Sequence, residues 1–522
     1  YFFTSAGVQS ILRRMKKNGV SPSELHRYAA IHINDTHPAL AIPELMRILM
    51  DEEGLSWDSA WSVTVQTAAY TNHTILAEAL EKWDVRMFRK LLPRIYMIVE
   101  EINRRFTAEV SRRYNGDWNR LNATSVIQDG VVKMAYLSIV GSHSVNGVAE
   151  LHTEILKNQE LKNFHEFYPG KFNNKTNGIS HRRWLLEANP ELSDLINETI
   201  GTDWQLHPSE LGSLRRWAED HAFLEKAAAV KRRKKEQLAA FIKEKYDIAA
   251  DPSSIFDIQV KRLHMYKRQL LNILHIMDLY NRLCDDPSLE MIPRTFIFGA
   301  KAFPGYLLAK NTIKLICTVA DRINRDSAVS RKLKVVFMPN YGVSLAQRMI
   351  PAGEVSEQIS TASKEASGTG NMKFMMNGAV TVATLDGANV EIHREVGDEN
   401  IVLFGLRSDE VIAYQKNGNY SAAEVIRSDP RLQRLLRQLQ EGYFGLAPQH
   451  EFDPIVKHLT EENDPYFTLK DFDAYVRAQE KIDTLYADRN AWNKMSVINT
   501  AASGVFSSDN TIRKYADEIW NV

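Results

Sequence analysis

The sequence predicts an α/β fold built on doubly wound parallel sheets, and three observations support that prediction. From about residue 253 onward, short β-rich runs alternate with longer helical ones, as in a parallel sheet with helical crossovers. The hydrophobic fraction of 44% and the charged fraction of 25% are those of a globular protein. The length of 522 residues exceeds one ordinary hydrophobic core, so two or more domains are expected.

The individual elements follow from residue type and spacing. Segments 267–283 and 306–320 have apolar residues close to the 3.6-residue period and are predicted helices. Residues 1–170 are predicted to be mainly helical, with a long amphipathic helix over 92–114 and one strand over 28–33. Ligands of a doubly wound sheet bind beyond the carboxyl ends of its strands. The β-rich runs that predict strands beyond residue 253 are 256–260, 295–298, 334–338, 380–385 and 401–404.

Composition excludes several classes of protein. Lys plus Arg and Asp plus Glu number 65 each, which argues against a nucleic-acid or membrane-surface protein. Two cysteines, Cys284 and Cys317, make a disulfide framework unexpected and favour a reducing compartment, so we predict a cytoplasmic protein. No apolar run approaches the roughly 20 residues that cross a bilayer. The chain opens at Tyr1 without an initiator Met or signal peptide, and we expect it to be a fragment.

A glycine-rich segment, Glu365–Phe374, is the strongest candidate for chemistry. Two glycines precede a helical, Met-rich run, and such a turn lets backbone N–H groups approach an anion. Lys373 lies one turn inside this predicted helix, where desolvation lowers an amine's pKa and makes it a possible imine-former. A capped helix with a solvated lysine explains the same pattern, and spacing alone does not decide between the two.

A basic segment, Lys261–Arg268, directly follows the predicted strand 256–260. Four cations within eight residues are costly at the end of a buried strand unless an anion neutralises them. The alternative is a solvated helix start, but the helix dipole disfavours cations in a first turn, which favours an anion site. By contrast, the run Lys231–Lys235 lies in the middle of a predicted helix, 223–246, and we predict that it forms a solvated face.

Three polar turns complete the candidate loops: Asn34–Pro38, Thr71–Thr74 and Asn173–Gly178. His32, Asp35 and His37 fit no standard zinc spacing, so we predict no metal site and expect polar groups that bind hydroxyls. His143 is predicted to be structural. Taken alone, these residues indicate an α/β protein with an anion-binding cleft and a candidate imine lysine, and they name no substrate.

The ordered set of motifs strongly resembles the α-1,4-glucan phosphorylase family. The resemblance implies a two-domain fold of the glycosyltransferase-B type, with the first domain truncated at its N-terminus. Residues 1–172 would be the remainder of that domain, 173–504 the carboxy-terminal cofactor-binding domain, and 505–522 a helix packing back through Ile512, Tyr515 and Ile519. The segments that resemble the family are Asn34–Leu40, Ala41–Arg47, Asn72–Thr74, Lys175–Ile179, Lys261–Arg268, Ser356–Ala362, Glu365–Phe374 and Asp386–Val390.

The resemblance also implies an activity: transfer of a terminal α-1,4-linked glucose to inorganic phosphate, giving glucose 1-phosphate with retention of configuration. The cofactor would be pyridoxal 5'-phosphate, whose phosphate group would act as acid and base. The expected partners are an α-1,4-glucan, inorganic phosphate and, in the full-length protein, a second copy of the chain. Regulated members also have effector sites. This stretch alone is expected to be poorly active.

Site roles follow from the same resemblance. Lys373 would hold the cofactor as an imine, and one departure is Gly342, where animal members have arginine. The implied catalytic cations are Lys261, Arg262 and Lys267. The other implied cofactor contacts are Lys261, Tyr341, Gly368, Thr369 and Gly370. The implied glucose contacts are His73, Asn177, Tyr266, Glu365, Ser367 and Gly368.

Three other functions compete with this one. A different pyridoxal-phosphate enzyme, such as an aminotransferase, would need an Asp near the pyridine nitrogen and an Arg for a substrate carboxylate. A nucleotide-sugar glycosyltransferase of similar fold would leave Lys373 without a cofactor. A non-catalytic glucan-binding fragment would bind glucans without cleaving them. Cofactor colour and phosphate dependence distinguish these alternatives from a phosphorylase.

Overall fold

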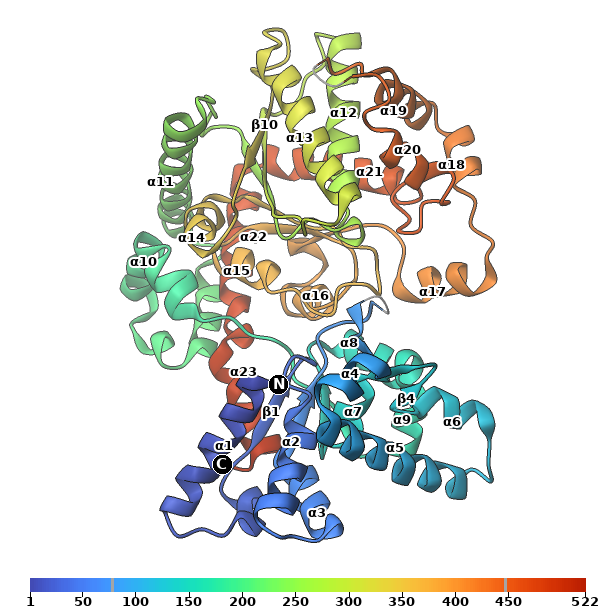
Figure 1. Cartoon of the computed structure of the whole chain (residues 1–522). Coiled ribbons are helices and arrows are strands. Elements are labelled where there is room, and N and C mark those ends of the chain that lie inside the picture. The colour runs from blue at the N-terminus through green and yellow to red at the C-terminus, as the bar shows by residue number, and fades with distance from the viewer. Residues whose placement is uncertain (77–78, 446–447) are drawn as a thin grey trace. The chain divides into compact units, whose positions relative to one another are not determined.

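The computed structural model describes residues 1–76, 79–445 and 448–522, which form two compact units (Figure 1). The first unit comprises Tyr1–Thr176 and Thr511–Val522, and the second comprises Asn177–Asn510. Parallel sheets with helical connections are present in both, so the predicted α/β class is confirmed. The boundary expected after residue 172 falls inside a strand of the first sheet, β7 (Phe172–Asn174), and the division between the units comes after that strand.

The first unit contains a parallel sheet that the sequence mostly failed to predict. Its order is β1-β2-β6-β7, with β1 at Ile31–Asn34, β2 at Ala68–Thr71 and β6 at Ser144–Gly147. Only β1 was expected. The strands β2 and β6 are buried at every position, so they lack the apolar–polar alternation that marks a half-exposed strand. A small antiparallel sheet has the order β3-β5-β4, at Lys82–Asp84, Val131–Lys133 and Ile127–Gln128.

The helices of the first unit surround these sheets. The longest, α5 (Pro93–Arg113), agrees with the predicted helix; Pro93 occupies its first turn, and Ile98, Ile102 and Phe106 are on its buried stripe. The others are α1 (Phe2–Lys17), η1 (Pro22–Arg27), α2 (Ala41–Arg47), η2 (Ile48–Glu52), α3 (Trp57–Thr67), α4 (Val85–Leu91), α6 (Trp118–Thr124), α7 (Met134–Val140), α8 (Glu150–Ile155), η4 (Leu156–Glu160) and α9 (Lys162–Phe167).

The end of the chain returns to the first sheet. It forms α23 (Ser508–Tyr515) and η11 (Ala516–Trp520), and Tyr515 and Ile519 pack against Ala69 of β2. The Tyr515 hydroxyl accepts a hydrogen bond from Asn146 Nδ2 at 2.9 Å. The expectation that Ile512 joins this contact was wrong, because its side chain is 52% exposed.

The second unit is built on a six-stranded parallel sheet of order β10-β9-β8-β11-β12-β13. The chain enters at the central strand β8, proceeds outward to β10, returns to β11 beside β8 and proceeds outward again to β13. The order therefore reverses between β8 and β11, which makes their carboxyl ends the switch point where ligands bind. The bounds are β8 Ile255–Val260, β9 Arg294–Gly299, β10 Leu333–Met338, β11 Val355–Gln358, β12 Val380–Ala383 and β13 Val402–Leu403.

Helices cover both faces of this sheet. α12 (Gln269–Asp285) and α13 (Leu307–Arg325) share one apolar core with strand residues such as Ile255. Three residues further along β8, Ile258 is on the opposite face, near Gly353 and Phe374 of α15 (Gly370–Met376). The remaining elements are η5 (Arg182–Glu187), α10 (Pro190–Ile200), η6 (Asp203–Gln205), η7 (Pro208–Trp217), α11 (His221–Tyr246), η8 (Met265–Lys267), α14 (Val343–Ala352), α16 (Asn389–Val396), η9 (Asp398–Asn400), α17 (Ser408–Asn417), α18 (Ala422–Ser428), α19 (Pro430–Glu441), α20 (Asp453–Thr460), α21 (Phe472–Ala487), α22 (Arg489–Ala502) and η10 (Ser503–Phe506).

The basic run on α11 is not the solvated face that the sequence predicted. Lys231 and Lys235 are one turn apart, so they project from the same side of the helix, which packs against α14 and α22. Lys235 Nζ lies 2.6 Å from Glu354 Oε2, and both side chains are only 3% exposed. Lys234 pairs with Glu191. The prediction was wrong because spacing identifies a face without showing what packs against it.

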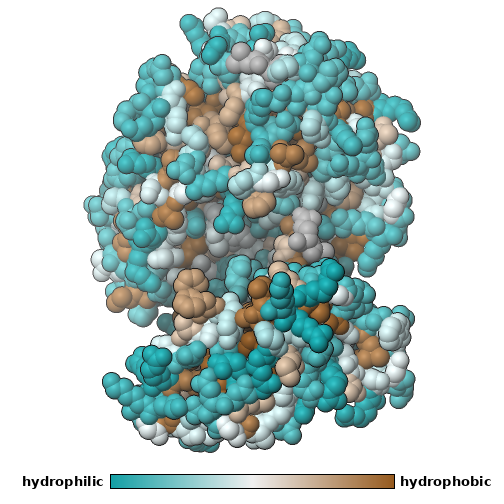
Figure 2. All heavy atoms as spheres, in the orientation of Figure 1, coloured by the Kyte–Doolittle hydropathy of each residue, from teal (hydrophilic) through white to brown (hydrophobic). Residues whose placement is uncertain are grey.

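The visible surface in Figure 2 is mostly hydrophilic, with hydrophobic residues scattered between. In the described part of the chain, no helix combines the length and apolar character that crossing a bilayer requires.

The Lys235–Glu354 pair leads to a stability prediction. Lys235→Met leaves the Glu354 carboxylate buried without its nearest cation; among the described residues the Tyr486 hydroxyl and the Phe256 N–H still donate to it, and an Arg489 nitrogen lies 3.8 Å away. We expect the free energy of unfolding in urea to fall by about 3–5 kcal/mol. Lys243→Met removes an exposed pair with Asp247, the C-cap residue of the same helix, and should leave the free energy of unfolding nearly unchanged. Adding Glu354→Gln to Lys235→Met should recover part of the loss; no recovery would contradict the buried-charge explanation.

Candidate functional site

The candidate site begins where β8 and β11 end side by side. Lys261 follows β8, and its Nζ donates to Oε1 of Gln358, the last residue of β11, at 2.7 Å. This bond joins the two strands at the switch point. Lys261 is a cation there whose hydrogen-bond partner, the Gln358 amide, is neutral. Burial, with the neighbouring Lys267, lowers the pKa of Lys261 to about 8. A second cation, Arg262, is exposed, and the described residues provide no ion pair for it.

Three predicted site residues contact one another in the next turn. Lys267 Nζ lies 2.5 Å from Glu365 Oε2, and the Tyr266 hydroxyl donates to Glu365 Oε1 at 3.2 Å. Burial by itself raises the pKa of Glu365, but the charges of Lys267 and Lys261 outweigh it and hold that pKa below its ordinary value. Residues expected to meet different parts of the substrates therefore form a single cluster.

Asp386, to which the sequence assigned no role, shapes the loop that presents Glu365. Its carboxyl group accepts hydrogen bonds from the Ser360 hydroxyl at 2.7 Å, from the Ser363 N–H at 2.9 Å and from the Glu365 N–H at 2.8 Å. Ser363 has a φ of +75°, an uncommon conformation for serine that these bonds help to maintain. Burial raises the pKa of Asp386 to about 7 despite the three donors.

Arg268 belongs to the framework and not to an anion site. Its side chain is fully buried and lies 2.7 Å from Asp471 Oδ2. It also donates to the carbonyls of Ile359 and Ser360, directly after β11. Counting it among four cations that await a ligand was therefore wrong, because Asp471 already supplies the anion.

The glycine-rich turn enters α15, which starts at Gly370 with Thr369 as its N-cap. Gly368 has a φ of +75° and Gly387 of +51°, both in the left-handed region. A Cβ at Gly387 would lie 2.6 Å from the Ser367 carbonyl oxygen, so only glycine fits against this turn. The Ser367 hydroxyl donates to the Gly368 carbonyl at 2.9 Å, which leaves its lone pairs to accept bonds.

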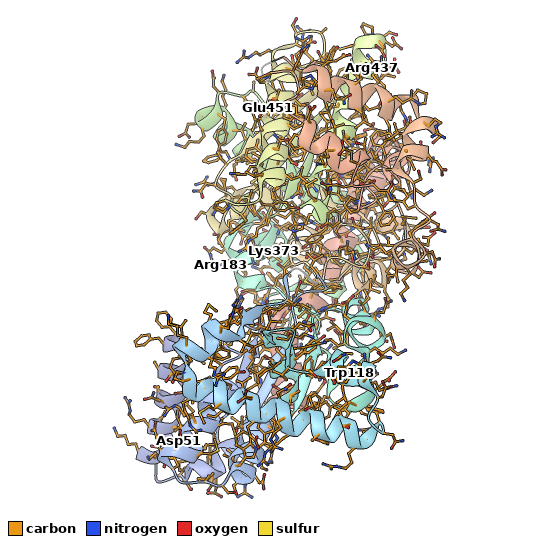
Figure 3. The ribbon with its side chains drawn as sticks, turned by 45° about the vertical axis from the view of Figure 1, so that its right-hand side comes forward. Asp51, Trp118, Arg183, Lys373, Arg437 and Glu451 are labelled. Carbon is orange, nitrogen blue, oxygen red and sulfur yellow. The ribbon has the colours of Figure 1, made fainter. Side chains whose placement is uncertain are left out.

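The Lys373 amine differs from those of Lys261 and Lys267 in its hydrogen-bond and ion-pair partners. In the part of the chain that the structure describes, no carboxylate pairs with Nζ and no oxygen accepts a hydrogen bond from it. Nζ lies 4.1 Å from the ring centroid of the Trp184 indole on η5. Burial lowers the pKa of Lys373. Figure 3 shows Lys373 near Arg183, which is on η5 together with Trp184.

Tyr341 follows β10 and lies over the end of the neighbouring strand β9. A Cβ at Gly299 would be 3.2 Å from the Tyr341 ring, so the absence of a side chain at Gly299 leaves room for this ring. Burial raises the pKa of Tyr341 to about 12. Gly342 is the N-cap of α14, and a side chain there would meet little besides the Asn340 carbonyl.

Comparison with known proteins places these features in a family. The whole chain, residues 1–522, matches the family described as carbohydrate phosphorylase. The chain belongs to this family. It is 55% identical to glycogen phosphorylase of Bacillus subtilis, 48% identical to the muscle form from mouse and 48% identical to the human liver form. In each case all of the chain is covered, and it spans 65%, 63% and 63% of the relative's length.

Two other predicted glucose contacts belong to different segments of the chain. In the first unit, His73 Nε2 lies 2.5 Å from Asn34 Oδ1, and burial lowers the pKa of His73 although Asp35 opposes this. Asn177 is half-buried at the start of the second unit. Sequence reasoning assigned no role to Trp184, Gln358 or Asp386, although Gln358 and Asp386 lie in the family segments Ser356–Ala362 and Asp386–Val390 and Trp184 follows the segment Lys175–Ile179.

The site's charge should depend on pH through Lys261. Because its pKa is about 8 and not near 10.5, Lys261 loses its charge as pH rises through 8. We expect the affinity of the chain for sulfate, measured by calorimetry from pH 7 to 10, to fall up to tenfold per pH unit above pH 8. Lys261→Arg keeps the charge and should flatten this dependence. An equal fall in the arginine variant would show that another group titrates.

Proposed function

We propose that this protein is a pyridoxal-phosphate-dependent α-1,4-glucan phosphorylase. It transfers a terminal glucose to inorganic phosphate and yields glucose 1-phosphate with retained configuration. Its relatives are named glycogen phosphorylases. The observation that supports the proposal most is the partly buried Lys373 amine, with which no carboxylate of the described residues pairs, in the unit whose switch point has Lys261 and Arg262.

The residues present fit the cofactor. Schiff-base chemistry needs an amine that loses its proton readily, and burial of Lys373 favours the neutral form. The Trp184 indole provides a flat apolar surface at that amine. Lys261, Tyr341 and the turn Gly368–Gly370 are the proposed contacts for the phosphate end. When bound, the cofactor supplies a phosphate group that exchanges protons around neutrality, since its second pKa is near about 6.

The cations of the site offset the repulsion between two phosphate groups. At a separation of about 4 Å and an effective dielectric constant of about 20, each pair of unit charges repels by roughly 4 kcal/mol. Arg262 is exposed and the described residues provide no ion pair for it, so its planar fork can bind substrate phosphate with two parallel bonds. Lys267 uses one of its three hydrogens on Glu365 and keeps two for the same phosphate.

Glucose would be held by groups that the loop already orients. The Glu365 carboxylate is positioned by Asp386 through its own N–H, and it can accept bonds from sugar hydroxyls while retaining Lys267. Tyr266 and the Ser367 lone pairs extend the same surface, and the Gly368 backbone allows close approach. His73 and Asn177 complete the proposed set.

The proposed reaction uses the substrate phosphate as both acid and nucleophile. Inorganic phosphate gives a proton to the glycosidic oxygen as the C–O bond breaks, and its oxygen then bonds to the anomeric carbon on the same face. Lys261, Arg262 and Lys267 stabilise the negative charge that grows on phosphate during proton transfer. Configuration is retained because departure and attack occur on one face.

The remaining proposals concern context. We propose a cytoplasmic enzyme, in keeping with Cys284 and Cys317, which are both free. We propose that the full-length protein forms a homodimer and that residues 177–510 are its cofactor-binding unit.

Arg262→Lys tests the function. We expect kcat/KM for phosphorolysis of maltoheptaose by the full-length protein to fall roughly a hundredfold, while the absorbance of bound cofactor is retained. Arg183→Lys, an exposed arginine paired with Glu187, is the matched control and should change neither. Unchanged phosphate dependence in Arg262→Lys would defeat the assignment. A colourless wild-type protein that cleaves glucans with water alone would defeat the proposed function itself.

A further inference from the structure

The most completely bonded lysine of the second unit is Lys231, in the middle of α11. Its Nζ donates to the carbonyl oxygens of Pro351 at 2.8 Å, Gly353 at 2.7 Å and Asn377 at 2.8 Å. An ammonium group has three hydrogens, so these acceptors use all of them. The bonds therefore hold parts of the protein together and leave nothing for a ligand.

The three carbonyls belong to the ends of two helices. Pro351 and Gly353 are at the end of α14, and Asn377 is the C-cap of α15. Helix ends of this kind present unsatisfied carbonyls and partial negative charge, which a buried cation stabilises. Both helices begin beside proposed cofactor contacts, α14 after Tyr341 and α15 after Gly368. One ammonium thus sets the relative position of two helices at the ends away from those contacts.

Asn377 extends the connection to the reactive lysine. Its Nδ2 donates to the Trp184 carbonyl at 2.8 Å and to the Lys373 carbonyl at 3.0 Å. Its Oδ1 accepts from Asn189 Nδ2 at 3.0 Å. The Trp184 indole in turn contacts the Lys373 amine. A continuous series of bonds therefore connects Lys231 through Asn377 to both sides of the contact between Lys373 and Trp184.

A cavity of about 250 Å³ adjoins this connection, and its lining includes Lys231, Lys235, Glu354 and Gly378. Gly378 directly follows the end of α15, so the cavity offers space into which that end can move. The Lys231 bonds oppose such a movement.

We propose that Lys231 is a positioning residue for Lys373: by holding the carbonyl ends of α14 and α15, it keeps the Lys373 amine buried against Trp184. The positioning is a property of this chain by itself, and its effect on catalysis rests on the proposed function. Lys231 is remote from the substrates in this proposal and acts only through α14, α15 and Asn377.

The first measurement follows the Lys373 amine without cofactor. The full chain is methylated with ¹³C-formaldehyde and a reductant, and the methylated Lys373 signal is titrated by NMR. In Lys231→Met we expect the pKa of this amine to rise by about one unit, a tenfold change in protonation, because a displaced helix end admits water. Lys234→Met, on the same helix but paired with Glu191, should leave the titration unchanged. An unchanged titration in folded Lys231→Met would overturn the proposal.

The second measurement uses the full-length protein with bound pyridoxal phosphate. We expect Lys231→Met to lower kcat tenfold or more while KM for phosphate stays within about twofold, because phosphate contacts Arg262 and not α15. Lys234→Met should change neither constant. If Lys231→Met does not fold, Asn377→Leu breaks the same connection one step nearer Lys373 and must shift the amine titration in the same direction; no shift would again overturn positioning. If the wild-type protein neither binds the cofactor nor cleaves glucan, the proposed function fails, and the amine titration still decides positioning.

Discussion

The need to give each buried positive charge an oxygen partner is the constraint on which the second unit depends. Lys235 has Glu354, Arg268 has Asp471, and Lys231 has three carbonyls. Because these partners are in different segments, each pair also joins parts of the fold: α11 to the residue before β11, and the turn after β8 to the turn before α21. A buried charge without such a partner would cost several kcal/mol, so these contacts are strongly specified.

Much of the second unit's sheet could be predicted, but β11 could not. The strands other than β11 are largely apolar runs between helical segments. β11 contains Ser356, Glu357 and Gln358, all buried, and no hydrophobic pattern marks it. Its burial is possible because of partners such as Gln479, whose Nε2 donates to Glu357 Oε1 at 2.6 Å across 122 positions of sequence. Contacts between residues so far apart in the sequence cannot be recognised from the residues around β11, although β11 supplies half of the switch point.

Two similar basic runs show the same limit for the candidate site. Lys231–Lys235 was predicted to be solvated, and most of its lysines are buried. Lys261–Arg268 was predicted to await anions, and the structure pairs Lys267 with Glu365 and Arg268 with Asp471. Local sequence located both runs and the glycine-rich turn correctly. It could not show which cations the fold itself neutralises, because that depends on which helix or loop packs against each face.

Sheet order alone does not select a chemistry, since the same doubly wound sheet serves many enzymes, nucleotide-sugar transferases among them. A difference between two lysines of the second unit does favour one chemistry. Burial lowers the pKa of both, but Lys261 has Glu365, Glu357 and Asp386 near enough to oppose the shift, whereas burial acts on Lys373 without a carboxylate to oppose it. Lys261, bonded to Gln358 at the switch point, is therefore placed to hold an anion, and Lys373, whose amine lies against the Trp184 indole, is placed to form a covalent bond. A nucleotide-sugar transferase has use for the first of these lysines and none for the second, so the pair favours a covalently held cofactor with an anionic group.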